Sequence, residues 1–292
     1  MKNLYSKIYK YIEESVNIEF EACGIKYLDG NYESKFRSSF YSLFSVVEKG
    51  GVESILKLKD KTVKIKRNEL IACYIPRETP GKTMFSGKEE VAILWSRMNF
   101  NIFGSLDLLD FFEIPYVFDP AVSAEILSIN QDLHMLETQK DNDPLRSLIK
   151  RKKLCFQMLD LILTCAVPKT DSGRKFAAIE EFLPIINYIN KNRRQKISNR
   201  DLAKLTHLSL SRFCHKFKTI FGLSPRKYIQ QLRFLEISRL LADTNTRINE
   251  IAAEYGFSDQ FHFSRAFKSA SGYSPREYRD MVRAAKGKLF SS

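Results

Sequence analysis

Histidine is scarce in this chain of 292 residues, which has only four. Residues 1–133 contain none, and the four are His134, His207, His215 and His262. A non-haem metal centre of the oxygenase type takes two His ligands and a carboxylate. The sequence therefore excludes a His-rich metal site in the first part of the chain, and it predicts no metal.

Motifs for zinc, cofactors and membrane insertion are absent as well. The five cysteines are odd in number and none is spaced as CxxC, so we expect reduced thiols and no zinc site. No P-loop, GxGxxG or GxSxG motif occurs. The most apolar stretch, residues 154–167, is too short to cross a bilayer, and the charged N-terminus is not a secretory signal. These absences predict a cytoplasmic protein that is not an enzyme, with no catalytic residues and no cofactor.

Acidic residues are scarce in the C-terminal part alone. Residues 1–167 hold 23 Lys and Arg against 23 Asp and Glu, whereas residues 168–292 hold 24 against 11. The difference, 24 − 11 = 13, is the whole net charge of +13. A neutral part joined to a strongly basic part favours a polyanion as the partner of the basic part. Charge alone does not choose among DNA, RNA and a membrane surface.

Residues 16–118 have the pattern of short strands separated by turns. β-Branched and aromatic residues are frequent, and from Val63 to Lys66 apolar and charged residues alternate, as on a sheet with one wet face. Many short strands with frequent turns are typical of a small barrel or sandwich. Tyr74, Arg77 and Trp95 lie on these predicted strands or turns and are candidates for lining a pocket, although packing or exposure is the more common fate of each.

The pattern changes to helix over residues 121–166. Apolar residues recur there at spacings of 4, 3, 4 and 3, and Asp143-Pro144 starts a second helix. Such a seam packs either on the chain's own barrel or on a second copy of the chain, since a period of about 3.5 residues suits a helix pair. We expect a homodimer whose seam is formed by Val122, Ile126, Ile129, Leu133 and Leu136.

The basic part contains one pattern twice. The two segments are FCHKFKTIFGLSPRKY, beginning at Phe213, and FHFSRAFKSASGYSPREY, beginning at Phe261. When Phe263 is aligned with Phe213, they share Phe, Phe-Lys, Gly, Ser-Pro and Tyr, each pair 50 residues apart. Each copy is predicted to be a helix, a tight turn and a second helix, at about residues 198–218 and 247–268. The second turn is expected to be one residue longer, because the earlier helices are 49 residues apart and the later ones 50.

The segment between the two copies has the length of a spacer. A helix from Ser224 to about Asp243 is predicted, and twenty residues at 1.5 Å each span about 30 Å. Successive major grooves on one face of DNA lie about 34–36 Å apart. The two copies therefore fit two neighbouring major grooves, although helical repeats that bind only proteins also exist.

The second copy also carries a family signature. EIAAEYGFSDQFHFSRAFKSASGYSPREYR resembles the signature of the AraC/XylS-type bacterial transcription regulators, and the resemblance covers about residues 180–282. It implies a DNA-binding domain over 179–292 that reads double-stranded DNA and works with RNA polymerase. It also implies a cupin-like barrel with dimerisation helices over 1–167, often sensing a small-molecule effector, and a linker over 168–178. The expected fold class is α+β, with the all-α domain last.

Base contacts are expected from the outward positions of the second helix of each copy, which we call the reader helix. Arg265 is the strongest candidate, since Arg donates two hydrogen bonds to guanine, while Gln260 suits adenine and Phe261 suits a thymine methyl group. The alternatives are a phosphate or intramolecular contact for Arg265 and packing for Phe261. The departures from the family pattern at Cys214-His215 and Phe261-His262 affect the target sequence. The full predicted set is Ser211, Arg212, Cys214, His215, Gln260, Phe261, Ser264 and Arg265.

Phosphate contacts are expected from basic side chains and from helix N-termini, which give affinity without sequence information. This set is Ser209, Lys216, Lys218, Ser258, Lys268 and Arg276, with Ser209 and Ser258 as the predicted N-caps. The expected function is a DNA-binding transcription regulator, more specifically an activator. The alternatives are an architectural or non-specific DNA-binding protein and a non-metal cupin-like enzyme fused to a DNA-binding module.

Overall fold

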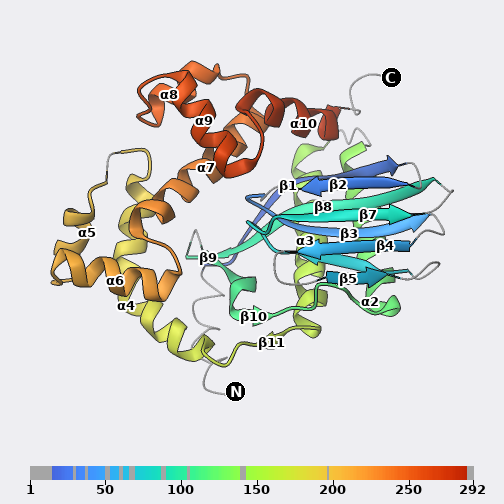
Figure 1. Cartoon of the computed structure of the whole chain (residues 1–292), viewed down its shortest axis with the longest axis horizontal. Coiled ribbons are helices and arrows are strands. Elements are labelled where there is room, and N and C mark those ends of the chain that lie inside the picture. The colour runs from blue at the N-terminus through green and yellow to red at the C-terminus, as the bar shows by residue number, and fades with distance from the viewer. Residues whose placement is uncertain are drawn as a thin grey trace. The chain divides into compact units, whose positions relative to one another are not determined.

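The computed structural model describes residues 15–28, 31–36, 39–49, 53–58, 62–65, 70–86, 90–103, 106–138, 143–195 and 197–287 (Figure 1). Contacts divide the chain into two compact units. The sheet unit includes residues 18–99 and 114–167, and the helical unit includes residues 100–113 and 168–276. No helix in the described ranges is long and apolar enough to cross a bilayer.

The sheet unit contains two antiparallel sheets, with strand orders β1-β8-β3-β6 and β2-β7-β4-β5 (Figure 1). The strands are β1 (Asn17–Leu28), β2 (Tyr32–Phe36), β3 (Ser42–Lys49), β4 (Glu53–Leu58), β5 (Thr62–Ile65), β6 (Ala72–Ile75), β7 (Gly81–Ser86) and β8 (Val91–Ile102). A short strand, β9 (Leu106–Asp107), pairs with the end of β8.

Apolar side chains from both sheets meet between them. One cluster joins Leu28 and Val91 of the first sheet to Phe85 of the second. Another joins Ile75 of the first sheet to Leu56 and Leu58 of the second. Strands that alternate apolar and polar residues bury one face in this way. The predicted α+β fold class is confirmed, with antiparallel sheets first and an all-helical part last.

Helix α2 (Pro120–Thr138) packs on the outer face of the first sheet, and α3 (Pro144–Thr164) packs on α2. Polar side chains fix α2 in place: the Ser123 hydroxyl accepts a hydrogen bond from the Ala72 N–H at 2.7 Å. The Ser96 hydroxyl donates to Asn130 Oδ1, also at 2.7 Å. Ile126 and Leu133 have no exposed surface.

The predicted dimer seam is therefore corrected at two positions. Ile126 and Leu133 lie in the core of the sheet unit and have no surface to offer a second copy. Val122, Ile129 and Leu136 are half-buried. The apolar periodicity of α2 reflects its packing on the chain's own sheet. A helix that packs on a sheet and a helix that packs on another helix both have apolar residues at spacings of three and four.

Helix α4 (Ser172–Asn192) begins inside the stretch that the sequence indicates as a linker, 168–178. The Ser172 hydroxyl donates to the Phe111 carbonyl at 2.6 Å, and the Phe176 ring lies 4.7 Å from the Phe111 ring. Phe111 ends a short 3-10 helix, η1 (Leu108–Phe111), which β10 (Phe112–Glu113) follows. A stretch that contains Pro, Ser and Gly thus becomes helical from Ser172 because a distant segment packs against it.

The rest of the helical unit is a series of capped helices that follow β11 (Val167–Pro168) and α4. They are α5 (Asn199–Leu205), α6 (Leu210–Phe221), α7 (Pro225–Asp243), α8 (Ile248–Glu254) and α9 (Gln260–Ser271). Helix α10 (Pro275–Gly287) follows, and its residues from 277 onward are assigned by contacts to the sheet unit. Helix α7 lies between the α5–α6 pair and the α8–α9 pair (Figure 1).

Candidate nucleic-acid interface

The first helix-turn-helix unit is α5 and α6 with the four-residue turn 206–209 between them. The Ser198 hydroxyl accepts from the Asp201 N–H at 3.1 Å and caps α5, and the Ser209 hydroxyl accepts from the Arg212 N–H at 3.4 Å and caps α6. Helix α6 ends at Gly222, whose φ of +73° belongs to the left-handed region that favours glycine. The N-cap at Ser209 is where the sequence predicted it.

The second unit is α8 and α9 with the five-residue turn 255–259, so the predicted extra residue is present. Gly256 has a φ of +72° in this turn, and His207 has a φ of +53° in the first turn. Ala203 and Ala252 are buried at equivalent positions. Their carbonyls accept from the Leu208 and Phe257 N–H groups respectively. The small side chains allow the helices of each unit to approach closely.

The N-terminus of α9 differs from the prediction. Asp259, and not Ser258, is the N-cap: its carboxylate accepts from the N–H groups of Phe261 at 2.8 Å and His262 at 2.7 Å. These bonds, first the one from His262, lower the pKa of Asp259. The cap is therefore an anion at neutral pH that occupies two of the N–H groups expected to face a phosphate. Two adjacent capping residues made the choice ambiguous in the sequence.

Helix α7 joins the two units by packing on both. Near its start, the Tyr228 ring lies 5.4 Å from the Phe217 ring of α6. In its middle, the Phe234 ring lies 5.7 Å from the Phe267 ring of α9 and 6.3 Å from the Phe257 ring. The length predicted for this spacer is confirmed by its bounds, Pro225–Asp243. The aromatic contacts hold the two reader helices, α6 and α9, on one rod.

Helix α4 supplies part of the core of the first unit. Its Phe182 has no exposed surface and packs on Phe213, Phe217 and Phe221, with ring centroids 6.0 to 6.2 Å apart. This role of α4 was not predicted from the sequence, although the apolar residues at 176, 179, 182 and 186 have a helical spacing. The first unit thus rests on a helix outside the repeat.

The residues predicted to contact bases lie on the outer faces of α6 and α9. In α6, Ser211, Arg212 and His215 are exposed, and Cys214 is half-buried near the Asn199 amide. In α9, Gln260 and Arg265 are exposed, and Ser264 donates to the Gln260 carbonyl at 2.7 Å.

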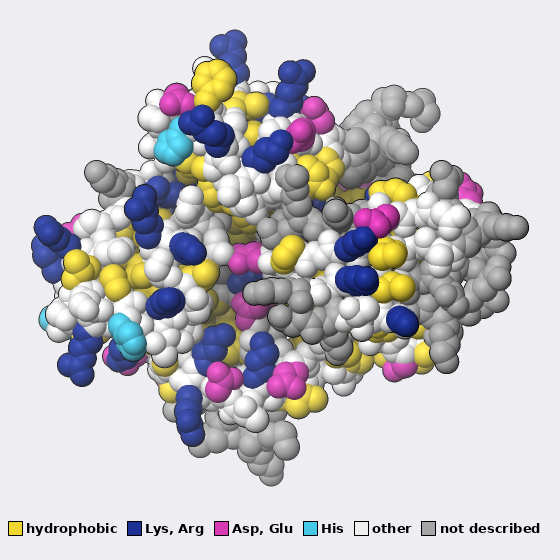
Figure 2. Space-filling model, viewed as in Figure 1, with side chains coloured by type: hydrophobic (Ala, Val, Ile, Leu, Met, Phe, Trp, Pro, Cys, Tyr) yellow, Lys and Arg dark blue, Asp and Glu magenta, His cyan; other side chains and the backbone are white. Residues whose placement is uncertain are grey.

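Phe261 is 68% exposed, which rules out the alternative that it packs within the chain. An exposed aromatic side chain at the start of a reader helix has the apolar surface that a thymine methyl group needs. Figure 2 shows Lys and Arg side chains gathered over the helical unit.

The predicted phosphate contacts divide into two groups. Ser209, Lys218, Ser258, Lys268 and Arg276 are exposed. Lys216 instead lies against α4: its Nζ is 2.5 Å from Glu181 Oε1 and 5.6 Å from the centre of the Phe182 ring. A lysine held by a carboxylate has less charge to offer a phosphate, so we assign Lys216 to the packing of α4 on α6.

The three pocket candidates of the sheet unit have different surroundings. Tyr74 is buried and stacks on Phe44, with ring centroids 5.2 Å apart, so it is a core residue. Arg77 is half-buried, and its backbone N–H donates to the Ser42 hydroxyl. Trp95 is half-buried, and the guanidinium carbon of Arg97 lies over the Trp95 ring, 5.2 Å from the ring centroid.

The thiols are expected to react in two groups. Burial raises the pKa of Cys73 and of Cys155 to about 12 and raises the pKa of Cys23 further. Because the thiolate is the nucleophile, these three should resist a maleimide at pH 8. Cys165 and Cys214, which are half-buried as Cys73 is, should react. Mass spectrometry of the native protein should find two labels, and all five only after unfolding. Rapid labelling of Cys23 or Cys155 would contradict the described core.

Comparison with known proteins decides the family of the helical unit. A family model described as a helix-turn-helix domain matches residues 202–281, which span α5 to α10. The chain carries an AraC/XylS-type DNA-binding domain. The AraC-type domain accounts for the duplication of the helix-turn-helix pattern, and α4, which completes its core, precedes the matched residues.

Curated relatives match about a third to a half of the chain. The chain is 31% identical over 112 residues to the lactose operon transcription activator of Staphylococcus xylosus, covering 38% of this chain and 40% of that protein. It is 25% identical over 151 residues to the transcriptional activator RhaS of Enterobacter sp. (strain 638), covering 52% and 53%. The chain thus spans about half the length of these relatives or less.

A solved structure matches more of the chain. The crystal structure of ToxT from Vibrio cholerae strain SCE256, with an unsaturated fatty acid bound, covers 92% of this chain and 96% of its own at a TM-score of 0.52. The identity is 14%, so the similarity shows the fold alone. It extends the likeness from the AraC-type domain to the sheet unit.

Proposed function

We propose that this protein is a sequence-specific transcription regulator, and an activator, that reads two adjacent major grooves through α6 and α9. The observation that carries the proposal is the pair of exposed reader helices held on one rod, α7, in a strongly basic part of the chain. A regulator of this kind works in the cytoplasm, has no enzymatic activity and acts on RNA polymerase. Two of the relatives are named as activators, which supports the sign of regulation.

The test is selection of binding sites from a random DNA library by the intact protein. We expect a sequence with two conserved blocks about one helical turn, or 34–36 Å, apart. Affinity for it should fall steeply with salt, since phosphate contacts release counterions. An architectural protein would bind with the same salt dependence but would select no sequence, and that result would overturn the proposal.

We further propose that the protein is a homodimer, formed through the exposed face of α3. Leu145, Ile149 and Phe156 are 66%, 60% and 46% exposed, and Leu148 is 40% exposed. Positions 145, 149, 152 and 156 are spaced 4, 3 and 4, which is the seam of a helix pair, with Lys152 as its polar member. This face replaces the α2 seam, whose central residues are buried.

A charge placed on this face should separate the copies. We expect Ile149→Glu to convert a dimer into a monomer, because two carboxylates would face each other across an apolar seam. Sedimentation equilibrium would measure the change. Gln157→Glu adds the same charge at an exposed position of α3 that is off the seam, and it should leave the dimer intact. A wild-type protein that is already monomeric would rule out the proposal.

We propose a small-molecule effector with a carboxylate for the sheet unit. Arg97 Nη1 donates to the nearly buried Glu21 at 3.3 Å, while the buried Arg97 Nε has no hydrogen-bond partner among the described residues. An unpaired buried donor is costly, and a carboxylate would accept from it. ToxT has a fatty acid bound in its crystal structure, which supports a carboxylate as the first class to test.

The effector proposal is tested by thermal unfolding with short- and long-chain fatty carboxylates. A ligand that binds only the folded state should raise the Tm of the wild type, and Arg97→Gln should abolish that rise. Lys82→Gln, a charge change on the surface pair with Glu33, should preserve it. No Tm change with any carboxylate, or an equal rise in the Arg97→Gln variant, would count against this site.

A further inference from the structure

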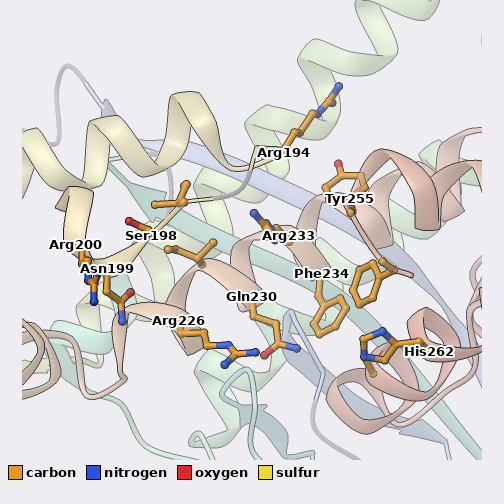
Figure 3. A pocket seen from close by; sticks show the side chains of 15 residues that line it. Arg194, Ser198, Asn199, Arg200, Arg226, Gln230, Arg233, Phe234, Tyr255 and His262 are labelled. Atoms are coloured by element: carbon orange, nitrogen blue, oxygen red, sulfur yellow. The ribbon is translucent and has the colours of Figure 1, made fainter. Parts of the chain in front are cut away.

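A cleft of about 880 Å³ lies between the two helix-turn-helix units, alongside α7 (Figure 3). Its walls come from three places: the start of α5 with Asn199 and Arg200, the first turns of α7 with Arg226 and Gln230, and the start of α9 with His262. Its apolar lining includes Ile229 and Phe234. The function proposed above uses only the outer faces of α6 and α9, and it leaves this cleft unexplained.

The cleft is strongly cationic. Four arginines line it, Arg194, Arg200, Arg226 and Arg233, and the described lining residues include no Asp or Glu. Uncompensated positive charge in a concave surface focuses the field and attracts an anion.

Two of the arginines are used within the fold. Arg194 donates from Nε to Glu236 at 2.8 Å and from Nη1 to Glu254 at 3.0 Å. Hydrogen bonding to Glu236 is the main reason why the pKa of Arg194 is raised. Arg233 donates from Nε to the Arg193 carbonyl at 2.6 Å. Burial lowers the pKa of Arg233, because removal from water disfavours the charged form.

The other two arginines are available. Arg200 and Arg226 are exposed, and neither forms an ion pair with any described residue. They lie on two different helices, α5 and α7, that face the same cleft (Figure 3). The amide side chains of Asn199 and Gln230 lie beside them and add hydrogen-bond donors.

The position of the cleft indicates the anion. It lies between the start of α5 in the first unit and the start of α9 in the second, alongside α7. We infer that when α6 and α9 occupy successive major grooves, the cleft faces the stretch of duplex between them. That stretch is a minor groove bordered by sugar–phosphate backbone. Arg side chains bind phosphate oxygens with two hydrogen bonds, and amides supplement them. A backbone segment supplies the repeated anions that two separate arginines need.

We propose that this cleft receives the sugar–phosphate backbone between the two half-sites, with Arg200 and Arg226 each binding a phosphate. The cleft is then a third DNA contact, independent of base sequence, that fixes the spacing of the two readers. This inference rests on the proposed DNA-binding function and adds residues that neither reader helix contains.

The test is a salt titration of DNA binding by the full-length protein and by Arg200→Gln, Arg226→Gln and the double variant. Each lost phosphate contact should make the fall of log K with log salt less steep, reducing the magnitude of the slope by about 0.9. The double variant should reduce it by about 1.8. Arg174→Gln, an exposed arginine of α4 outside the cleft, is the matched control and should leave the slope unchanged. Base preferences should be the same in all variants, since the contacts are to phosphates.

Phosphate ethylation interference locates the contact. In the wild type, ethylation between the two half-sites should inhibit binding, and the double variant should lose that inhibition alone. Unchanged slopes with normal site selection would overturn the cleft contact and leave the regulator intact. If the wild type selects no sequence, the regulator fails, and the same titration on a random duplex still tests the cleft. Slope changes of Arg200→Gln and Arg226→Gln equal to that of Arg174→Gln would also overturn the cleft contact.

Discussion

Phe182→Ala should destabilise the first helix-turn-helix unit by about 3–5 kcal/mol, the usual cost of removing a buried Phe side chain. Phe182 has no exposed surface and packs on Phe213, Phe217 and Phe221. The substitution leaves a cavity at the point where α4 supports α6. Because that ring cluster belongs to the first unit, the loss should be local before it is global.

Amide hydrogen exchange of the intact protein measures this effect. Protection should fall in α6 far more than in α9, and binding to the half-site read by α6 should weaken with it. Tyr188→Ala is the matched control, since Tyr188 is an aromatic residue of α4 that is 37% exposed. An equal loss of protection in α6 and α9 would show that α4 does not support the first unit in particular.

Arg265→Ala should cost about 1–3 kcal/mol of discrimination at one base pair, through the loss of a bidentate contact to guanine. Arg265 is exposed on α9, four residues after the exposed Phe261, on the face that we propose meets the groove. The measurement is binding of the selected site and of its three substituted versions at each position. Discrimination should be lost at one position only.

Lys268→Ala provides the comparison for Arg265→Ala. A phosphate contact carries no sequence information, so this variant should bind all sequences more weakly by the same factor and should lower the salt slope by about 1. If Arg265→Ala behaves in the same way as Lys268→Ala, then Arg265 contacts the backbone. In that case another exposed residue of α9 reads the second half-site.

Features set by neighbouring residues were predictable from the sequence. The N-cap at Ser209 and the bounds of α7 depend on capping residues next to the helix ends, and both were predicted. Asp259 was missed because Ser258 and Asp259 are both good caps, and only the backbone geometry decides between them.

Features set by distant contacts were not predictable in the same way. The helical state of residues 172–178 depends on Phe111, about sixty residues earlier. The ion pair of Lys216 with Glu181 depends on the packing of α4 on α6. The burial of Ile126 and Leu133 has the periodicity of a dimer seam, so the pattern alone could not reveal which partner covers them.

The path of the chain limits how the protein can be divided into fragments. Strand β8 starts in the sheet unit, but its last residues and the segment after it, 100–113, belong to the helical unit. There Phe103 and Phe111 pack on Phe176, and the Phe103 carbonyl accepts a hydrogen bond from the Asn190 side chain. A truncated protein that starts at residue 168 would leave one side of α4 bare and its apolar residues in water. Conversely, a protein cleaved once near residue 170 would keep a piece of its first fragment embedded in the second, and the two fragments would elute together.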